Sequence, residues 1–307
     1  MHKKLVVILG PTASGKTSLS LKLAEKLNGE IVSADSRQIY RELDIGTAKP
    51  DKKQLKQIKH YLINIKNPNQ HYTVAQYKRE AIKAINKIIK SGKVPFLVGG
   101  TGLYIKSLTD NLEIPEVKPD WKLRDKLESE IKNKGLKNVY NKLIKLDPEA
   151  AYIIDKNNPR RVVRALEIAI KTKKPFSQQR KKGKPLFDIL EIGLNPGEKK
   201  LIKIINKRVD RMIETGLLKE VKRLIKKYNK KLHTFDAIGY REIIDCLDNK
   251  ISLKEAAERI KKNTWHFAKR QMTWFKKPAV PTQDDQIHWV KNQKEAGRLI
   301  SEFLSSR

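Results

Sequence analysis

An eight-residue run near the N-terminus has the residue types and the spacing of a phosphate-binding loop. A glycine is followed by four residues and then by Gly-Lys-Thr, and the run consists of Gly10, Pro11, Thr12, Ala13, Ser14, Gly15, Lys16 and Thr17. Glycines let successive backbone N–H groups turn toward phosphate oxygens, the lysine can neutralise the terminal phosphate, and the Thr17 hydroxyl can bind Mg²⁺. The loop therefore predicts a site for a di- or triphosphate, and nothing in it contacts a base.

The segments on either side of this loop are those that a phosphate-binding loop requires. Apolar residues 5–9 precede it and predict a buried strand, and leucines at helical spacing follow it through residues 19–27. The N-terminus of that helix would add its positive dipole to the phosphate site. A chance glycine turn is the alternative, and the strand before it and the helix after it argue against that alternative.

Polar residues also follow two further predicted strands. Asp35 comes after the short strand 29–34, and Thr101 comes after the buried strand 94–98 in a glycine-rich segment. Ligands of a doubly wound sheet bind outside the carboxyl ends of its strands, so both side chains are expected beside the phosphate loop. The Asp35 carboxylate could bind Mg²⁺, act as a general base or cap a helix. No aspartate ends the strand 94–98, which argues against a motor or switch NTPase.

The chain has a large excess of basic residues. Its 307 residues include 67 Lys and Arg against 34 Asp and Glu, a formal net charge of +33. An excess of this size favours a polyanionic partner, above all nucleic acid, although a lysine-rich proteome or a solvated surface would also produce it. The single cysteine, Cys246, excludes an internal disulfide and agrees with a cytoplasmic protein. No stretch approaches the ~20 apolar residues that span a membrane.

The secondary-structure patterns in the sequence divide the chain into three parts. Strand and helix patterns alternate through residues 1–113, strand signals are absent through 114–186, and 187–307 returns to the sheet and ends in helices. We expect an α/β protein with a P-loop NTPase-like parallel sheet flanked by helices and an inserted all-helical subdomain. Residues 61–65 are expected to form one strand of that sheet.

Two predicted helices carry clustered basic residues. In the inserted segment, Arg160, Arg161 and Arg164 crowd into the first turn of one helix, which like-charge repulsion disfavours unless they face phosphates. A solvated basic face is the alternative. In a long helix from 253 to about 275, an aromatic stripe is expected to pack in the core, and the opposite basic side is expected to meet a nucleic-acid backbone.

Six segments in this order resemble the tRNA dimethylallyltransferases, also called tRNA isopentenyltransferases. The resemblance covers almost the whole chain and rests on residues 10–17, 33–40, 44–50, 98–104, 237–242 and 268–275. The phosphate loop alone is shared with many NTPases, whereas the six segments together are specific. The absence of a C-terminal zinc-finger extension agrees with the bacterial form of the family.

The resemblance implies transfer of a dimethylallyl group from dimethylallyl diphosphate to N6 of the adenosine on the 3′ side of the anticodon. The phosphate loop would hold the diphosphate leaving group, with Mg²⁺ as cofactor on Thr17, and Arg208 would add a cation to it. Asp35, helped by Thr101, would accept the N6 proton, so the implied catalytic residues are Asp35, Thr101 and Arg208. The implied partners are a tRNA anticodon stem–loop and dimethylallyl diphosphate but no membrane, for an enzyme expected to be monomeric.

The implied tRNA contacts come from the turn after the second strand, the insertion and the C-terminal helices. Gln38 is the expected reader of the adenine, which must flip from its stack to reach the site. The full set is Asp35, Ser36, Arg37, Gln38, Thr101, Arg160, Arg161, Arg164, Gly239, Tyr240, Arg241, Lys269 and Arg270.

Two departures and two alternatives qualify this interpretation. Residues 264–267 read Thr-Trp-His-Phe where members often have Thr-Arg before an aromatic residue, and Lys276 and Lys277 stand where arginines are common. A stacking role for Trp265 follows as a hypothesis. A nucleoside or small-molecule kinase would share the phosphate loop and the Asp35 base but would have no use for the basic insertion. A non-catalytic tRNA-binding protein would explain the charge but not the loop.

Overall fold

The computed structural model describes residues 3–115, 117–179, 181–276 and 287–306. Its internal contacts divide the chain into two units. The first unit combines Met1–Thr109 with Leu186–Arg307, and the second is Asp110–Pro185, where the sequence predicts an insertion over 114–186.

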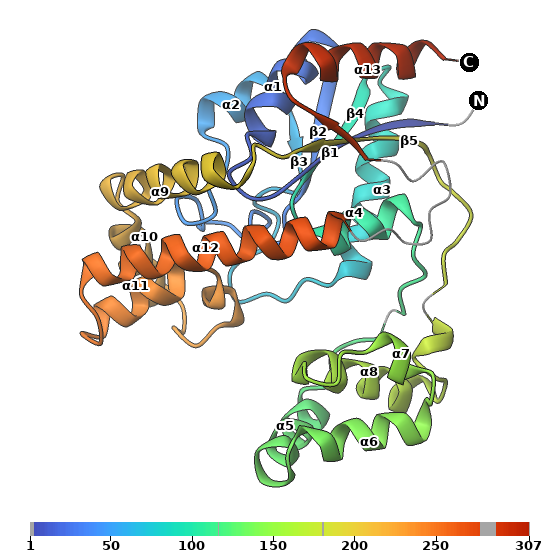
Figure 1. Cartoon of the computed structure of the whole chain (residues 1–307), viewed down its shortest axis with the longest axis vertical. Coiled ribbons are helices and arrows are strands. Elements are labelled where there is room, and N and C mark those ends of the chain that lie inside the picture. Colours follow the sequence, from blue (N-terminus) through green and yellow to red (C-terminus); the bar gives the residue numbers. More distant parts are fainter. Residues whose placement is uncertain (1–2, 116, 180, 277–286, 307) are drawn as a thin grey trace. The chain divides into compact units, whose positions relative to one another are not determined.

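The described residues of the first unit form a six-stranded sheet in the order β3-β2-β4-β1-β5-β6 (Figure 1). Every pairing in this sheet is parallel. Leu9 pairs with both Gly99 and Gly193, and Ala34 also pairs with Gly99, so four strands end together at one edge. The expected α/β class is therefore confirmed. The strands are β1 Lys4–Leu9, β2 Gly29–Ala34, β3 His60–Tyr61, β4 Val94–Gly99, β5 Asp188–Leu194 and β6 His288–Val290.

Helices cover both faces of the sheet because side chains alternate along each strand. Leu5 and Val7 of β1 face one side and pack with buried residues of α3 and α4. Val6 and Ile8 face the other side and pack with α1 and α13. The helices of these two layers are α1 Lys16–Lys26, α3 Val74–Lys90, α4 Gly102–Thr109 and α13 Gln293–Ser305.

A third hydrophobic core joins the C-terminal helices to the loop that follows β2. Leu201 and Val209 of α9, Leu217 of α10 and Ala268 of α12 are buried in it together with Leu43. In Figure 1, α12 runs alongside α9, and the two helices are in contact. The helices around this core are α9 Glu198–Glu214, α10 Leu217–Lys227, α11 Tyr240–Leu247 and α12 Leu253–Lys276. A short helix, α2 Lys52–Gln57, precedes β3.

The strand expected at 61–65 is wrong beyond its first residue. The structure has a strand only at His60–Tyr61, because Leu62 and Asn64 adopt left-handed backbone angles, with φ of 62° and 58°. The chain then turns to pair with the loop after β2, and the Ile65 N–H donates to the Ile39 carbonyl at 2.8 Å.

In the described residues of the second unit, the regular secondary structure is helical apart from one isolated β-bridge. Buried residues such as Leu127, Val139 and Leu166 form a core of its own. Its helices are α5 Trp121–Lys134, α6 Leu136–Leu146, α7 Ala150–Ile153 and α8 Pro159–Thr172. Across the described ranges of both units, no helix is long and apolar enough to span a bilayer.

Candidate active site

The phosphate loop takes the backbone path that its glycines permit. Gly10 and Gly15 have φ of 145° and 93°, in the region that glycine tolerates. A Cβ on Gly10 would lie 2.5 Å from the carbonyl oxygen of Leu194, so the close approach of β5 also requires glycine. Helix α1 begins at Lys16, directly after the loop, and its N-terminal N–H groups remain available to an anion.

Lys16 lies folded over this loop. Its Nζ donates to the Pro11 carbonyl at 2.6 Å and to the Ser14 Oγ at 3.4 Å. The pKa of Lys16 is lowered to about 7, chiefly by burial and also by the Arg208 guanidinium, while the Asp35 carboxylate partly opposes both effects. A diphosphate is the kind of anion that would stabilise its protonated form.

Arg208 is the second cation at the loop. It projects from α9, and its Nη1 donates to the Thr12 Oγ1 at 3.4 Å. Burial lowers its pKa, and Asp35 partly offsets this shift. Arg211 lies one turn further along α9 and is exposed. The structure therefore brings Arg208 to the phosphate loop, as the resemblance implies.

Asp35 follows β2 at the same edge of the sheet. Its Oδ1 accepts from the backbone N–H groups of Arg37 at 2.8 Å and Gln38 at 3.4 Å. These bonds cap a turn, since no helix follows. Within the described residues, Oδ2 makes no hydrogen bond. One carboxylate oxygen is thus structural, and the other is available for chemistry.

Thr101 connects the ends of β2 and β4. Its Oγ1 accepts from the Ser36 N–H at 3.0 Å, and its own N–H donates to the Ala34 carbonyl at 3.1 Å. Thr101, which is expected to assist Asp35 in catalysis, therefore also fixes the turn that carries Asp35.

Gln38 has its amide group held by a neighbouring loop. Its Nε2 donates to the Thr47 carbonyl at 3.3 Å and the Ala48 carbonyl at 3.5 Å. Because both partners are acceptors, the amide nitrogen must face them, and Oε1 faces away as an acceptor.

The candidate tRNA residues of the C-terminal helices fall into two groups. Lys269 and Arg270 are exposed on α12, and Arg241 is exposed and forms an ion pair with Glu242 at 3.4 Å. Gly239 and Tyr240, in contrast, are buried. The Tyr240 side chain has 0% exposure and its hydroxyl donates to Glu220 Oε1 at 2.7 Å, so the side chain is held inside the protein, and a tRNA contact by Tyr240 stays a prediction.

In the second unit, Arg160 and Arg161 are exposed at the start of α8. Arg164 is half-buried, and it pairs with the fully buried carboxylate of Glu167 and donates to the Val117 carbonyl. Arg124 also pairs with Glu167, at 2.8 Å. Part of the arginine crowding in this helix is thus explained by an internal carboxylate, and a phosphate contact by Arg164 stays a prediction.

Gln271 is a site residue that the sequence interpretation did not single out. It lies buried on α12, where its Oε1 accepts from the Thr12 N–H at 2.7 Å and its Nε2 donates to the Gly100 carbonyl at 2.8 Å. A Cβ on Gly100 would lie 2.4 Å from that nitrogen. The available signal was a polar residue within the apolar stripe between Ala268 and Met272.

The aromatic stripe of α12 packs as expected. Trp265 is partly buried against the core shared with α9 and α10, and the Lys269 ammonium lies 5.7 Å from its ring centroid. A stacking role for Trp265 with a base stays a hypothesis. Lys276 is exposed, and Lys277 lies outside the described residues.

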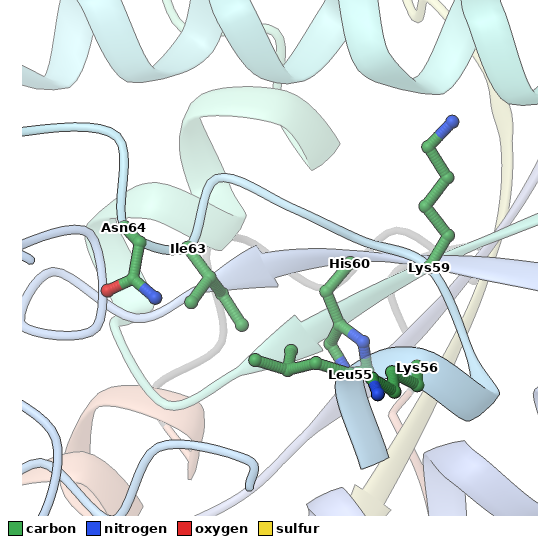
Figure 2. A pocket seen from close by; sticks show the side chains of 6 residues that line it. All are labelled: Leu55, Lys56, Lys59, His60, Ile63 and Asn64. Atoms are coloured by element: carbon green, nitrogen blue, oxygen red, sulfur yellow. The ribbon is translucent and has the colours of Figure 1, made fainter. Parts of the chain in front are cut away.

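A pocket of about 270 Å³ lies beside the short strand β3 (Figure 2). None of its lining residues belongs to the phosphate loop, the Asp35 turn or α12, so the pocket is not the place where these groups meet. It is lined by Leu55, Lys56, Lys59, His60, Ile63 and Asn64.

No group of three or more His, Cys, Asp and Glu side chains in the described ranges could hold a metal by itself. The Thr17 hydroxyl, in the first turn of α1, donates and accepts no hydrogen bond among the described residues. It is a hard oxygen donor of the kind that Mg²⁺ uses when phosphates and water complete its coordination.

Comparison with known proteins decides the family. The sequence model of the IPP transferases matches residues 38–278. The chain belongs to this family. It is 46% identical over 294 residues to a tRNA dimethylallyltransferase of Acetivibrio thermocellus, covering 94% of this chain and 92% of that protein.

Two solved structures of similar proteins match nearly the whole chain. A tRNA isopentenylpyrophosphate transferase from Bacillus halodurans aligns with a TM-score of 0.70 and 38% identity, covering 99% of this chain and 96% of that one. A eukaryotic dimethylallyltransferase acting on tRNA aligns with a TM-score of 0.85 and 32% identity, covering 99% of this chain and 80% of that one. The family and fold expected from the six sequence segments are thereby confirmed.

Proposed function

We propose that this chain transfers a dimethylallyl group from dimethylallyl diphosphate to N6 of the adenosine 3′-adjacent to the anticodon in tRNAs, releasing diphosphate. The observation that carries the proposal is a carboxylate with one uncommitted oxygen, on Asp35, within electrostatic reach of two partly buried cations at a phosphate loop. The names of the related proteins support the same activity.

Lys16, Arg208 and the loop N–H groups act on the leaving group. As the bond from the allylic carbon to the diphosphate oxygen breaks, negative charge develops on that oxygen. Both cations are already fixed beside the loop, so little reorganisation is needed when the charge appears. For the transfer, they would have to hold the diphosphate with its allylic carbon toward the turn after β2.

Asp35 acts on the nucleophile. The adenine N6 lone pair forms the new bond to the allylic carbon, and the proton lost from N6 passes to the Asp35 Oδ2. The Oδ1 hydrogen bonds to Arg37 and Gln38 hold the carboxylate during this transfer. The Gln38 Oε1 would accept a hydrogen bond from the second N6 proton. Proton transfer of this kind contributes about 10²–10⁴-fold to rate.

Mg²⁺ would be held by the Thr17 hydroxyl and the diphosphate, with Asp35 as a nearby carboxylate. When bound, it would supply further charge stabilisation for the departing diphosphate. The RNA partner is the anticodon stem–loop, whose phosphates would meet the exposed basic residues of α12 and α8. The phosphate loop, Asp35 and Arg208 all lie in one unit of one chain, which supports function as a monomer.

The test is incubation of the protein with dimethylallyl diphosphate, Mg²⁺ and an anticodon stem–loop carrying consecutive adenosines, followed by RNA mass measurement. We expect the mass of one added dimethylallyl group with the wild type. Asp35→Asn keeps a side chain of the same size, whose Oδ1 can still accept the hydrogen bonds of the turn, but removes the base, so transfer should fall by about 10²–10⁴-fold while RNA still binds. Consumption of ATP with no gain in RNA mass would instead favour a kinase.

A further inference from the structure

A single buried carboxylate holds the first residues of the segment Asp44–Pro50. Glu220 of α10 is only 7% exposed. It accepts from three consecutive backbone N–H groups, those of Asp44 at 3.2 Å, Ile45 at 2.8 Å and Gly46 at 3.2 Å. The Tyr240 hydroxyl is its fourth donor, at 2.7 Å. Four donors on two oxygens make a charge-assisted network that fixes the path of this loop.

The Tyr240 ring closes over the same loop. A Cβ on Gly46 would lie 2.5 Å from the ring, so the loop passes beneath it at a distance that only glycine allows. Lys49 secures the far end of the segment, with its Nζ donating to the Tyr40 carbonyl at 2.8 Å and the Asp44 carboxylate at 2.7 Å. The loop is thus constrained at both ends.

The middle of this loop is what orients Gln38. The Thr47 and Ala48 carbonyls receive both hydrogen bonds that the structure gives to the Gln38 Nε2. If the loop shifts, these carbonyls move, and the amide is free to rotate and present a donor in place of its acceptor. An acceptor fits the 6-amino group of adenine, whereas a freely rotating amide fits a purine without that group equally well.

We infer that Glu220 is a positioning residue that sets the preference for adenine by holding Asp44–Ala48 and, through it, the orientation of Gln38. Glu220 is buried and reaches no RNA itself, so it acts only through the loop. This inference rests on the proposed function, since it concerns how the same site recognises its base.

Glu220→Gln is the variant that tests this role. The substitution keeps the size of the side chain but replaces one oxygen with an NH₂ group, which cannot accept from the loop. At least one backbone N–H would lose its partner, and the loop would relax. The readout is the ratio of dissociation constants for two stem–loops, one with adenine and one with purine, which lacks the 6-amino group, at the target position.

We expect the wild type to prefer adenine and Glu220→Gln to reduce that preference by about five- to tenfold. This factor corresponds to the loss of one hydrogen bond to the base. The KM for dimethylallyl diphosphate should stay within about twofold of the wild type, because the variant leaves the phosphate loop intact. In a Gln38→Ala background, Glu220→Gln should cause no further loss of preference, since both act on one contact.

Glu42→Gln is the matched control. Glu42 also ties α10 to the region after β2, by accepting from the Lys227 Nζ at 2.7 Å and the Tyr228 hydroxyl at 3.0 Å, but it accepts no bond from Asp44–Ala48. The Glu42→Gln variant should prefer adenine over purine to the same extent as the wild type. If Glu220→Gln does not fold, Tyr240→Phe removes one donor of the same network and should shift the ratio in the same direction.

An unchanged preference in a folded Glu220→Gln protein, or losses that add in full to those of Gln38→Ala, would overturn the inference. Failure of the proposed function has a different signature, because the wild type would then add no dimethylallyl group to RNA. The ratio of dissociation constants needs no turnover, so the two failures are distinguished.

Discussion

The binding of diphosphate should shift the protonation equilibrium of the Lys16 side chain. Its pKa is lowered to about 7, chiefly by burial, with Arg208 adding to this and Asp35 opposing it. A bound diphosphate raises that pKa, because an anion stabilises the charged form. Above pH 7 the free protein therefore lacks a proton that the complex holds, so binding takes up a proton and affinity falls as pH rises, by up to about tenfold per pH unit.

Calorimetric titration of dimethylallyl diphosphate between pH 6 and 9, in buffers of different ionisation enthalpy, measures both the affinity and the proton uptake. Lys16→Arg keeps a permanent charge and should flatten the profile above pH 7. An equal slope in this variant would assign the titration to another group.

Arg208 should stabilise the diphosphate leaving group and should not contribute to RNA binding. Arg208→Ala removes one fixed cation from the developing charge, and we expect kcat/KM for dimethylallyl diphosphate to fall by about 10²–10³-fold, with RNA affinity nearly unchanged. Arg211→Ala, one turn further on the same helix and exposed, should match the wild type. Steady-state kinetics with each substrate varied in turn separates these effects, and a large change in RNA affinity would argue against the assignment.

At the scale of single residues, the sequence was sufficient to predict the site residues whose positions depend on local spacing. The phosphate loop and Asp35 are of this kind, because a strand end and the next few residues determine their positions. Gln271 and Glu220 could not be found in this way. Their partners lie 259 and about 175 positions away in the chain, and only the folded structure brings them together.

Helix α12 is fastened to the phosphate loop by Gln271, which gives an element-scale prediction. Gln271→Ala leaves the Thr12 N–H and the Gly100 carbonyl without their partners, so the free energy of unfolding should fall by about 1–3 kcal/mol. Thr273→Ala removes only an exposed hydroxyl bonded within α12 and should cost less than about 0.5 kcal/mol. Urea unfolding at equilibrium measures both.

The same variant should also weaken diphosphate binding, because the Thr12 backbone belongs to the phosphate loop. A Gln271→Ala protein with wild-type stability and a wild-type KM for dimethylallyl diphosphate would show that this link between α12 and the loop is not needed.

The elements themselves were predicted unequally. Long amphipathic helices such as α3 and α12 and the buried strands of the sheet follow from periodicity. Residues 61–65 have a strand-like composition but leave the sheet at Leu62. The cause is tertiary, because this stretch pairs with the loop after β2, and no local pattern encodes that partner.

For the whole molecule, the net charge of +33 has to be divided between general surface charge and an RNA footprint. Binding that neutralises phosphates releases counterions, so the logarithm of affinity falls linearly with the logarithm of salt concentration, in proportion to the number of phosphates contacted. Arg164 is already paired with Glu167 and should contribute little to that slope, whereas exposed residues on the proposed interface should contribute fully.

Lys269→Ala and Arg270→Ala should each reduce the salt slope for stem–loop binding by about one, since each would remove one of the phosphate contacts proposed for α12. Lys294→Ala on α13 removes an equally exposed charge outside the proposed interface and should leave the slope unchanged. Fluorescence anisotropy with a labelled stem–loop at several salt concentrations gives these slopes. Equal decreases in the salt slope at all three positions would mean that the RNA responds only to the overall electrostatic field of a lysine-rich surface. Helix α12 would then not form a specific part of the interface.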